Sequence, residues 1–205
     1  VLVEPGVYEE GLEVDDGQCF SIWRCDRESE SNKEEMAKVE WRSRDDNTLF
    51  AHGSVAVSVN GMHMSAVKSE GYDGDGFSCV AAAKGATLSL EGCDLTCEGG
   101  QPVTQFAFEE TTGVVCGCCI HDGKEEGVGI AAGASATLEN NNIHSNTVVG
   151  VSVKGEGTAA VLRGNRIHDG KMIGVGIGVK ASATLENNTI TDNDLSGVTI
   201  GNHAT

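Results

Sequence analysis

The sequence has little proline, few aromatic residues and no long apolar run. Its 205 residues include 2 Pro, and aromatic residues make up 4%. No stretch approaches the roughly 18 consecutive apolar residues of a membrane-spanning helix. The first residues, VLVEPGVYEE, lack a cationic region leading into an apolar one. The sequence therefore predicts neither a membrane span nor a signal peptide, and 39% apolar residues suffice for one folded domain.

Positive charge is also scarce. The chain has 14 Lys+Arg against 31 Asp+Glu, a net charge of −17. Six acids and five bases lie from Gly127 onward, so residues 1–126 carry 25 acids and 9 bases, a net of −16. Such a surface opposes contacts that neutralise phosphate, which excludes nucleic acid and anionic membranes as partners. It favours cations or basic protein segments instead.

Cysteine is too sparse for a disulfide-built scaffold. There are 8 Cys in the chain, well below the density of such scaffolds. The spacing offers no two pairs of zinc ligands, and the one local cluster runs from Cys116 to Cys119. We therefore expect reduced thiols, an intracellular compartment and no structural metal.

The C-terminal third of the chain repeats itself every 23 or 24 residues. Successive blocks begin GVGIAAGASATLEN at Gly127, GVSVKGEGTAAVLRGN at Gly150, GVGIGVKASATLENN at Gly174 and GVTIGNHAT at Gly197. Each block contains short runs in which apolar and polar residues alternate, which predicts three strands of about three to five residues. Three short strands per repeat are typical of coils stacked on one another, so we expect an all-β, single-stranded parallel β-helix.

Residues one period apart should stack into inward columns about 4.8 Å apart. The predicted columns are Val128, Val151, Val175 and Val198; Ile130, Val153, Ile177 and Ile200; Leu138, Leu162 and Leu185; and Ile143, Ile167 and Ile190. A coil of roughly 23 to 24 residues predicts about seven to nine coils in one domain over residues 1–205. We expect irregular acidic coils at 1–126, with a charged insertion at 26–38, and regular repeats at 127–205. The absent initiator Met and the ragged ends predict a piece of a longer protein.

Polar residues repeat at the same period and predict side-chain ladders. Asn141, Asn165 and Asn188 share one column, in which stacked amides can bond to one another. Cys93 and Cys118 occupy that column in the two preceding coils. Small buried thiols are one interpretation of this pair, and a disulfide between stacked coils is the other. The ladder is expected to be structural.

A second polar column contains the candidate catalytic residues. His121, His144 and His168 each follow a third-strand isoleucine, and Asp122 and Asp169 come directly after two of them. Imidazole and carboxylate together can transfer protons or bind a transition metal. The alternative is that a repeated turn needs polar residues there and that duplication copied them. The sequence leaves both interpretations open.

One loop is a candidate calcium site. The segment GYDGDG at 71–76 combines a flexible backbone with the carboxylates of Asp73 and Asp75. It lacks the downstream bidentate Glu of an EF-hand loop, so a solvated turn is the alternative. No other cofactor is expected.

The repeats at 109–200 resemble a known family. RGNRIHDGK, from Arg163 to Lys171, is similar to RRNKIHDGK in the β-helix of F-box only protein 11, and IHDGK also occurs 47 residues earlier, from Ile120 to Lys124. These motifs resemble the CASH, or pectin-lyase-like, β-helix repeats. The resemblance implies a right-handed β-helix and, in the F-box branch, a surface that recognises substrates of a ubiquitin ligase. No F-box is visible in this sequence.

Two function classes are compatible with these observations. The first is a non-catalytic scaffold for protein–protein interaction or assembly. The second is a carbohydrate-binding or carbohydrate-active β-helix, such as a lyase, epimerase or hydrolase, that uses the His and Asp column. A net charge of −16 in residues 1–126 opposes a polyanionic glycan, and a fold alone does not establish an enzyme. We therefore expect a protein partner, with a glycan as the alternative.

Overall fold

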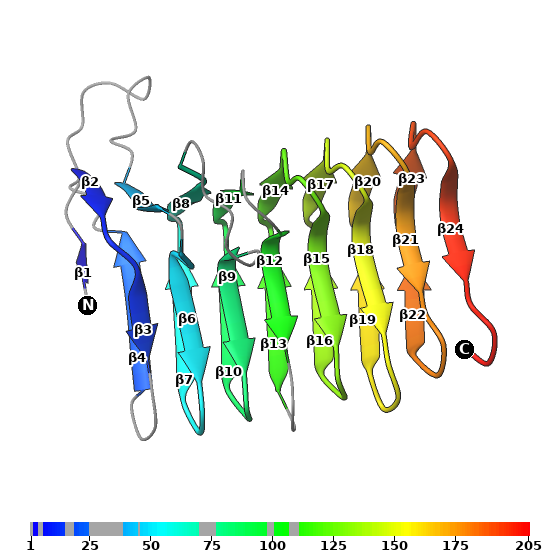
Figure 1. The fold of residues 1–205 in the computed structure, drawn as a ribbon, viewed down its shortest axis with the longest axis horizontal. Coiled ribbons are helices and arrows are strands. Elements are labelled where there is room, and N and C mark those ends of the chain that lie inside the picture. Colours follow the sequence, from blue (N-terminus) through cyan, green and yellow to red (C-terminus); the bar gives the residue numbers. More distant parts are fainter. Residues whose placement is uncertain are drawn as a thin grey trace.

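In the computed structural model the chain winds into a parallel β-helix, which confirms the predicted fold class. The structure describes residues 2–3, 6–14, 19–24, 39–44, 46–69, 77–97, 101–106 and 111–205. Within these ranges, three parallel sheets of eight strands each run the length of the molecule (Figure 1). The predicted insertion at 26–38 and the calcium candidates Asp73 and Asp75 lie outside the described residues.

Each coil contributes one strand to each sheet. Sheet A contains β1 (Leu2–Val3), β4 (Cys19–Arg24), β7 (Ala56–Asn60), β10 (Thr87–Glu91), β13 (Thr112–Cys116), β16 (Ser135–Glu139), β19 (Ala159–Arg163) and β22 (Ser182–Glu186). Sheet B contains β2 (Gly6–Glu9), β5 (Val39–Arg44), β8 (His63–Val67), β11 (Asp94–Cys97), β14 (Cys119–His121), β17 (Asn142–His144), β20 (Arg166–His168) and β23 (Thr189–Thr191). Sheet C contains β3 (Leu12–Val14), β6 (Leu49–His52), β9 (Ser78–Ala83), β12 (Gln101–Phe106), β15 (Glu126–Ala131), β18 (Val149–Lys154), β21 (Ile173–Ile177) and β24 (Ser196–Ile200). The described part of the chain has no helix long and apolar enough to cross a membrane.

The strand register confirms all four predicted apolar columns. Leu138 pairs with Leu162, and both side chains are fully buried. Val198 and Ile200 keep this register but are 42% and 63% exposed, because β24 pairs only with β21. Since no coil has a core of its own, the stacked aliphatic contacts supply much of the stability.

Glycines at the start of the repeats let neighbouring coils approach closely. A Cβ on Gly150 would lie 2.6 Å from Ile167 Cγ2 and 2.7 Å from the Gly174 carbonyl oxygen. A Cβ on Gly174 would lie 2.6 Å from the Gly197 carbonyl oxygen. These separations are shorter than van der Waals contact, so the glycines that open the repeats at Gly127, Gly150 and Gly174 are required by the packing of one coil on the next.

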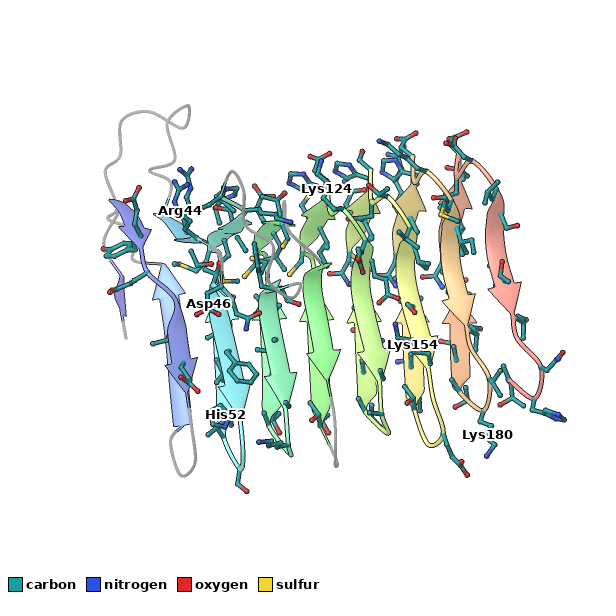
Figure 2. The ribbon with its side chains drawn as sticks, viewed as in Figure 1. Arg44, Asp46, His52, Lys124, Lys154 and Lys180 are labelled. Atoms are coloured by element: carbon teal, nitrogen blue, oxygen red, sulfur yellow. The ribbon has the colours of Figure 1, made fainter. Side chains whose placement is uncertain are left out.

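Charged side chains on the outer faces pair between coils. The guanidinium of Arg163 lies 3.4 Å from the carboxylate of Glu139 and 2.7 Å from that of Glu186, which belong to the coils on either side. On sheet C, Lys154, which is labelled in Figure 2, has its Nζ 2.9 Å from Glu126 Oε1. These pairs result from the same register as the core, so one stacking geometry arranges both the interior and the surface.

Candidate functional site

The three histidines predicted to stack lie side by side on the outer face of sheet B. The register pairs His121 with His144 and His144 with His168. The ring centroids of His121 and His144 are 5.1 Å apart with an interplanar angle of 7°, and those of His144 and His168 are 5.2 Å apart at 22°. This separation is close to the spacing of neighbouring strands, so the ring stack follows from strand pairing.

The residue after each histidine adopts a left-handed backbone conformation. Asp122, Ser145 and Asp169, which follow the three histidines, have φ values of 58°, 57° and 53°, and Asp192, which follows Thr191 at the same position of the next coil, has a φ of 56°. Short polar side chains tolerate this region better than most others. The turn itself therefore favours the polar residues that the sequence repeats at this position.

These side chains also orient the imidazole rings. Asp122 Oδ2 lies 2.6 Å from His121 Nδ1, and Asp169 Oδ2 lies 2.6 Å from His168 Nδ1. The Ser145 hydroxyl takes the same place 3.1 Å from the Nδ1 of the preceding histidine. Each ring is thus held through Nδ1, and its Nε2 faces the neighbouring column of sheet B.

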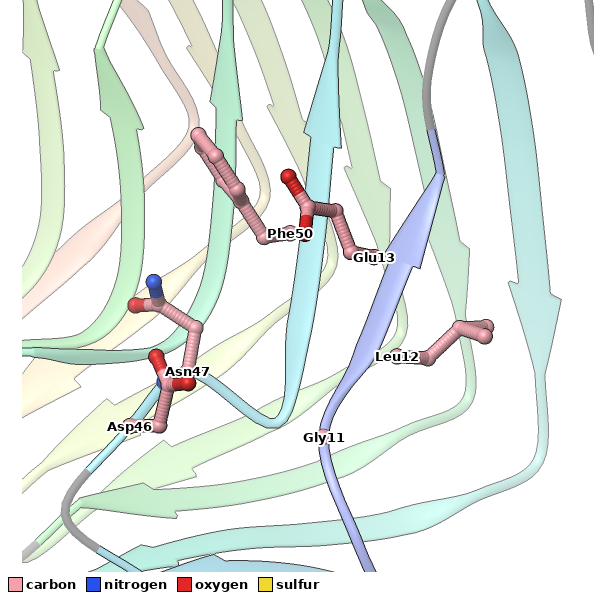
Figure 3. Close-up of a pocket in the computed structure, with 6 residues that line it drawn as sticks. All are labelled: Gly11, Leu12, Glu13, Asp46, Asn47 and Phe50. Carbon is pink, nitrogen blue, oxygen red and sulfur yellow. The ribbon is translucent and has the colours of Figure 1, made fainter.

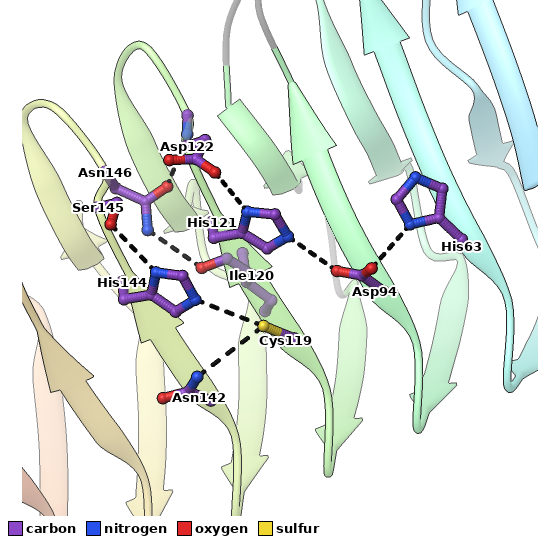
Figure 4. Close-up of polar contacts among 11 residues, drawn as sticks. His63, Asp94, Cys119, Ile120, His121, Asp122, Asn142, His144, Ser145 and Asn146 are labelled. Carbon is purple, nitrogen blue, oxygen red and sulfur yellow. Dashed lines mark hydrogen bonds and ion pairs between the residues drawn. The ribbon is translucent and has the colours of Figure 1, made fainter. Parts of the chain in front are cut away.

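The neighbouring column contains four residues that the sequence analysis missed, namely His63, Asp94, Cys119 and Asn142. Figure 4 shows all four of these beside His121 and His144. Asp94 bridges two imidazoles, with Oδ1 2.8 Å from His121 Nε2 and Oδ2 2.8 Å from His63 Nδ1. Cys119 Sγ lies 3.5 Å from the Nε2 of the second stacked histidine, His144. The repeated residue types do not mark these four positions. The sequence could have indicated them only by their place two residues before the histidine column.

The pKa values in this cluster shift because of these contacts. Burial lowers the pKa of His121, but hydrogen bonds to Asp122 and Asp94 outweigh it and leave the pKa raised. Burial raises the pKa of Asp94, but its hydrogen bonds to His121 and His63 outweigh burial and leave that pKa lowered. Burial and the charges of the two flanking histidines lower the pKa of His144. The cluster therefore favours a cationic His121 beside an ionised Asp94.

The thiol in the cluster is protonated under ordinary conditions. Burial, followed by the charge of Asp94, raises the pKa of Cys119. Asp94, Cys119 and His121 each offer one donor atom, and these three atoms lie within 4.8 Å of one another. Together with the nearby His144, they are the described residues best placed to hold a metal ion.

The asparagine and cysteine column forms a ladder inside the turn between sheets A and B. Asn165 Nδ2 lies 3.0 Å from Asn188 Oδ1, and Asn141 Nδ2 lies 2.9 Å from Asn165 Oδ1. Cys118 N–H donates to Asn141 Oδ1 at 2.9 Å, and Cys93 N–H donates to Cys118 Sγ at 3.4 Å. Both cysteines are free thiols, so the disulfide alternative is wrong and the packed-thiol arrangement is present.

Two shallow hollows lie away from this cluster. One, of about 200 Å³, lies beside β3 and β6 and is lined by Gly11, Leu12, Glu13, Asp46, Asn47 and Phe50 (Figure 3). The other, of about 240 Å³, lies on the outer face of sheet A over β13, β16 and β19. Both are smaller than the roughly 300–1,000 Å³ of most small-molecule sites.

Comparison with known proteins supports the fold and not a specific activity. No curated protein matches the chain. A family model described as a right handed beta helix region matches residues 56–205, which is most of the sequence. The chain therefore belongs to the right-handed β-helix family.

Proposed function

We propose that this β-helix is a non-catalytic scaffold that binds an extended, basic segment of a partner protein on the outer face of sheet A. The observation that carries the proposal is the flat, uncharged surface over β13, β16 and β19. Its lining residues are Thr112, Gly113, Val114, Ser135, Ala136, Thr137, Ala159, Ala160 and Val161. The outward side chains among them are small, so a partner backbone could lie close to the sheet.

The shape of this face favours a polypeptide over a small molecule. Its hollow of about 240 Å³ is too shallow to enclose a drug-sized ligand. Val114 is 40% exposed, which supplies an apolar contact on β13, the first strand of the face. The strands beneath are hydrogen-bonded on both sides, so a partner would contact side chains and would not add a strand to the sheet.

Charge specifies the chemistry of the partner. Residues 1–126 carry a net charge of −16 and residues 127–205 a net charge of −1, so cationic segments are attracted most strongly toward the N-terminal side of this face, beside β13. The likeness of residues 109–200 to the β-helix of F-box only protein 11 supports the same role, because that β-helix is associated with substrate recognition. A basic, extended peptide fits both the flat face and the charge.

A carbohydrate-binding role is the second candidate, and the row of polar side chains on sheet B favours it. The Asp122 and Asp169 side chains are 64% and 61% exposed and stand beside stacked imidazoles. They belong to coils separated by one other coil, a backbone spacing of roughly 9.6 Å. That spacing is at the upper limit for an inverting glycosidase and far above that of a retaining one, so binding is favoured over hydrolysis.

Two binding experiments distinguish the protein-binding scaffold from the carbohydrate-binding role. A random peptide library displayed against the purified chain should enrich basic peptides whose binding weakens with added salt. Thr137→Arg should weaken these peptides at least tenfold, whereas Thr199→Arg adds the same charge to an exposed position of sheet C and should change binding much less. Equal effects of the two variants contradict the proposal. Glycan-array binding that disappears in His144→Ala and His168→Ala supports the carbohydrate candidate.

A further inference from the structure

We propose that Asp94, Cys119, His121 and His144 form a binding site for a transition-metal ion of the Zn²⁺ class. The residues come from three consecutive strands of sheet B, β11, β14 and β17. The site is independent of the proposed peptide-binding face, which lies on sheet A.

Three of the four donor atoms already converge, and the fourth lies beside one of them. Asp94 Oδ1, Cys119 Sγ and His121 Nε2 lie within 4.8 Å of one another, and His144 Nε2 lies 3.5 Å from Cys119 Sγ. Ligand atoms on a tetrahedral zinc ion are separated by roughly 3.4 to 3.6 Å. The Cys119–His144 pair already has this separation. The His121 and His144 rings are stacked with planes 7° from parallel, so the binding of both to one ion requires the His144 ring to turn out of the stack by a change of rotamer.

The surroundings give each imidazole a partner at Nδ1 and leave Nε2 on the side of the site. His121 presents Nε2 to the site while its Nδ1 is 2.6 Å from Asp122. His144 likewise presents Nε2 while its Nδ1 is 3.1 Å from the Ser145 hydroxyl. Metal-bound histidines usually have their second nitrogen fixed by such a partner, which sets the tautomer.

The outer oxygen of the carboxylate ligand is also held in place. Asp94 Oδ2 lies 2.8 Å from His63 Nδ1, which leaves Oδ1 directed at the site. The Asp94 and His121 side chains are 42% and 22% exposed, so an ion can enter from solvent. The donor set contains sulfur and two imidazoles, which select Zn²⁺, Co²⁺ or copper over Ca²⁺ or Mg²⁺.

Binding exchanges protons for the ion. The proton shared by His121 Nε2 and Asp94 Oδ1, which are 2.8 Å apart, leaves to solvent, as does the Cys119 thiol proton. Four ligand bonds to the metal form in their place, and no redox change occurs. The net charge of −17 favours uptake of the cation.

Cobalt titration tests the site. The metal-free, reduced chain titrated with Co²⁺ should develop a thiolate-to-cobalt charge-transfer band that saturates at one equivalent and is removed by Zn²⁺. Cys119→Ser should abolish the band, whereas Cys116→Ser, which alters another half-buried thiol three residues away, should retain it. Asp94→Asn and His144→Gln should weaken Co²⁺ binding at least tenfold. His168→Gln should not, because that ring bonds to Asn142.

The alternative outcomes overturn the proposal. If the wild-type chain develops no band, the four residues do not form a metal site. A band that persists in Cys119→Ser, or that Cys116→Ser removes, assigns the thiolate to another position. Circular dichroism of each variant, compared with the wild type, verifies that the fold is retained and that loss of the band reports on ligation.

Discussion

Replacing Asn165 by Ala should destabilise the β-helix more than any surface substitution. The Asn165 side chain makes four hydrogen bonds. Its Nδ2 donates to Leu138 O at 2.9 Å and to Asn188 Oδ1 at 3.0 Å. Its Oδ1 accepts from Asn141 N at 3.0 Å and from Asn141 Nδ2 at 2.9 Å. Alanine removes all four bonds.

The expected loss follows from the groups that remain. The backbone N–H and the side-chain Nδ2 of Asn141 both donate to Asn165 Oδ1. Because Asn141 is 2% exposed, water cannot replace this acceptor when Asn165 becomes alanine. A buried donor without an acceptor costs about 1–3 kcal/mol, and the two together predict a loss of about 2–6 kcal/mol. Asn188→Ala should cost less, because Asn188 is half-buried at the edge of the ladder and water can replace its amide.

Urea denaturation followed by far-ultraviolet circular dichroism measures this loss. The matched control is Asn202→Ala, an exposed position at which a change within about 0.5 kcal/mol is expected. The denaturant dependence should also be compared, because a repeat protein can lose cooperativity when one coil is weakened. If Asn165→Ala and Asn202→Ala unfold at the same urea concentration, the buried amide ladder does not stabilise the fold.

Three further predictions concern the core, the coil contacts and the thiols. Leu162→Ala should lower the free energy of unfolding by about 2–5 kcal/mol, since Leu162 is fully buried; a loss below about 1 kcal/mol in urea titration would contradict this. Gly150→Ala should lower the thermal midpoint far more than Gly176→Ala, whose added Cβ meets only Val149 Cγ1 at 3.6 Å; similar midpoints would refute the role of close coil packing. Cys116 should be alkylated before Cys79, whose pKa is raised mainly by complete burial; mass spectrometry of the native chain checks the order, and equal rates would be inconsistent with the structure.

The repeat period of 23 or 24 residues was sufficient to predict which core residues and which histidines stack in columns. Because strand pairing in a coil repeats at a fixed spacing, residues 23 or 24 positions apart are hydrogen-bonded neighbours. Leu138 and Leu162 are therefore predictable, as are the stacked rings of His121 and His144.

The column of sheet B beside the histidines could not be found by searching for repeated residue types. Asp94, Cys119 and Asn142 occupy one column but have three different side chains, so similarity between repeats does not identify them. Their position alone, two residues before the histidine column, could have placed them. Their hydrogen bonds depend on rotamers, which the period does not specify.

A repeated contact between asparagine side chains and the backbone was missed for a related reason. Asn146 Oδ1 accepts from Gly123 N at 3.0 Å, and Asn193 Oδ1 accepts from Gly170 N at 3.1 Å. These asparagines recur after two coils and not after one, so a search at the single-coil period does not detect them.

Nuclear Overhauser contacts in an isotope-labelled sample test the stacking most directly. Ring protons of His144 should show cross-peaks to the rings of both His121 and His168, whose centroids lie 5.1 Å and 5.2 Å away. Methyl groups of Leu162 should likewise show cross-peaks to those of Leu138 and Leu185. Histidine-to-glutamine variants assign each ring signal. Cross-peaks confined to residues close in sequence would contradict the stacked coils on which the account depends.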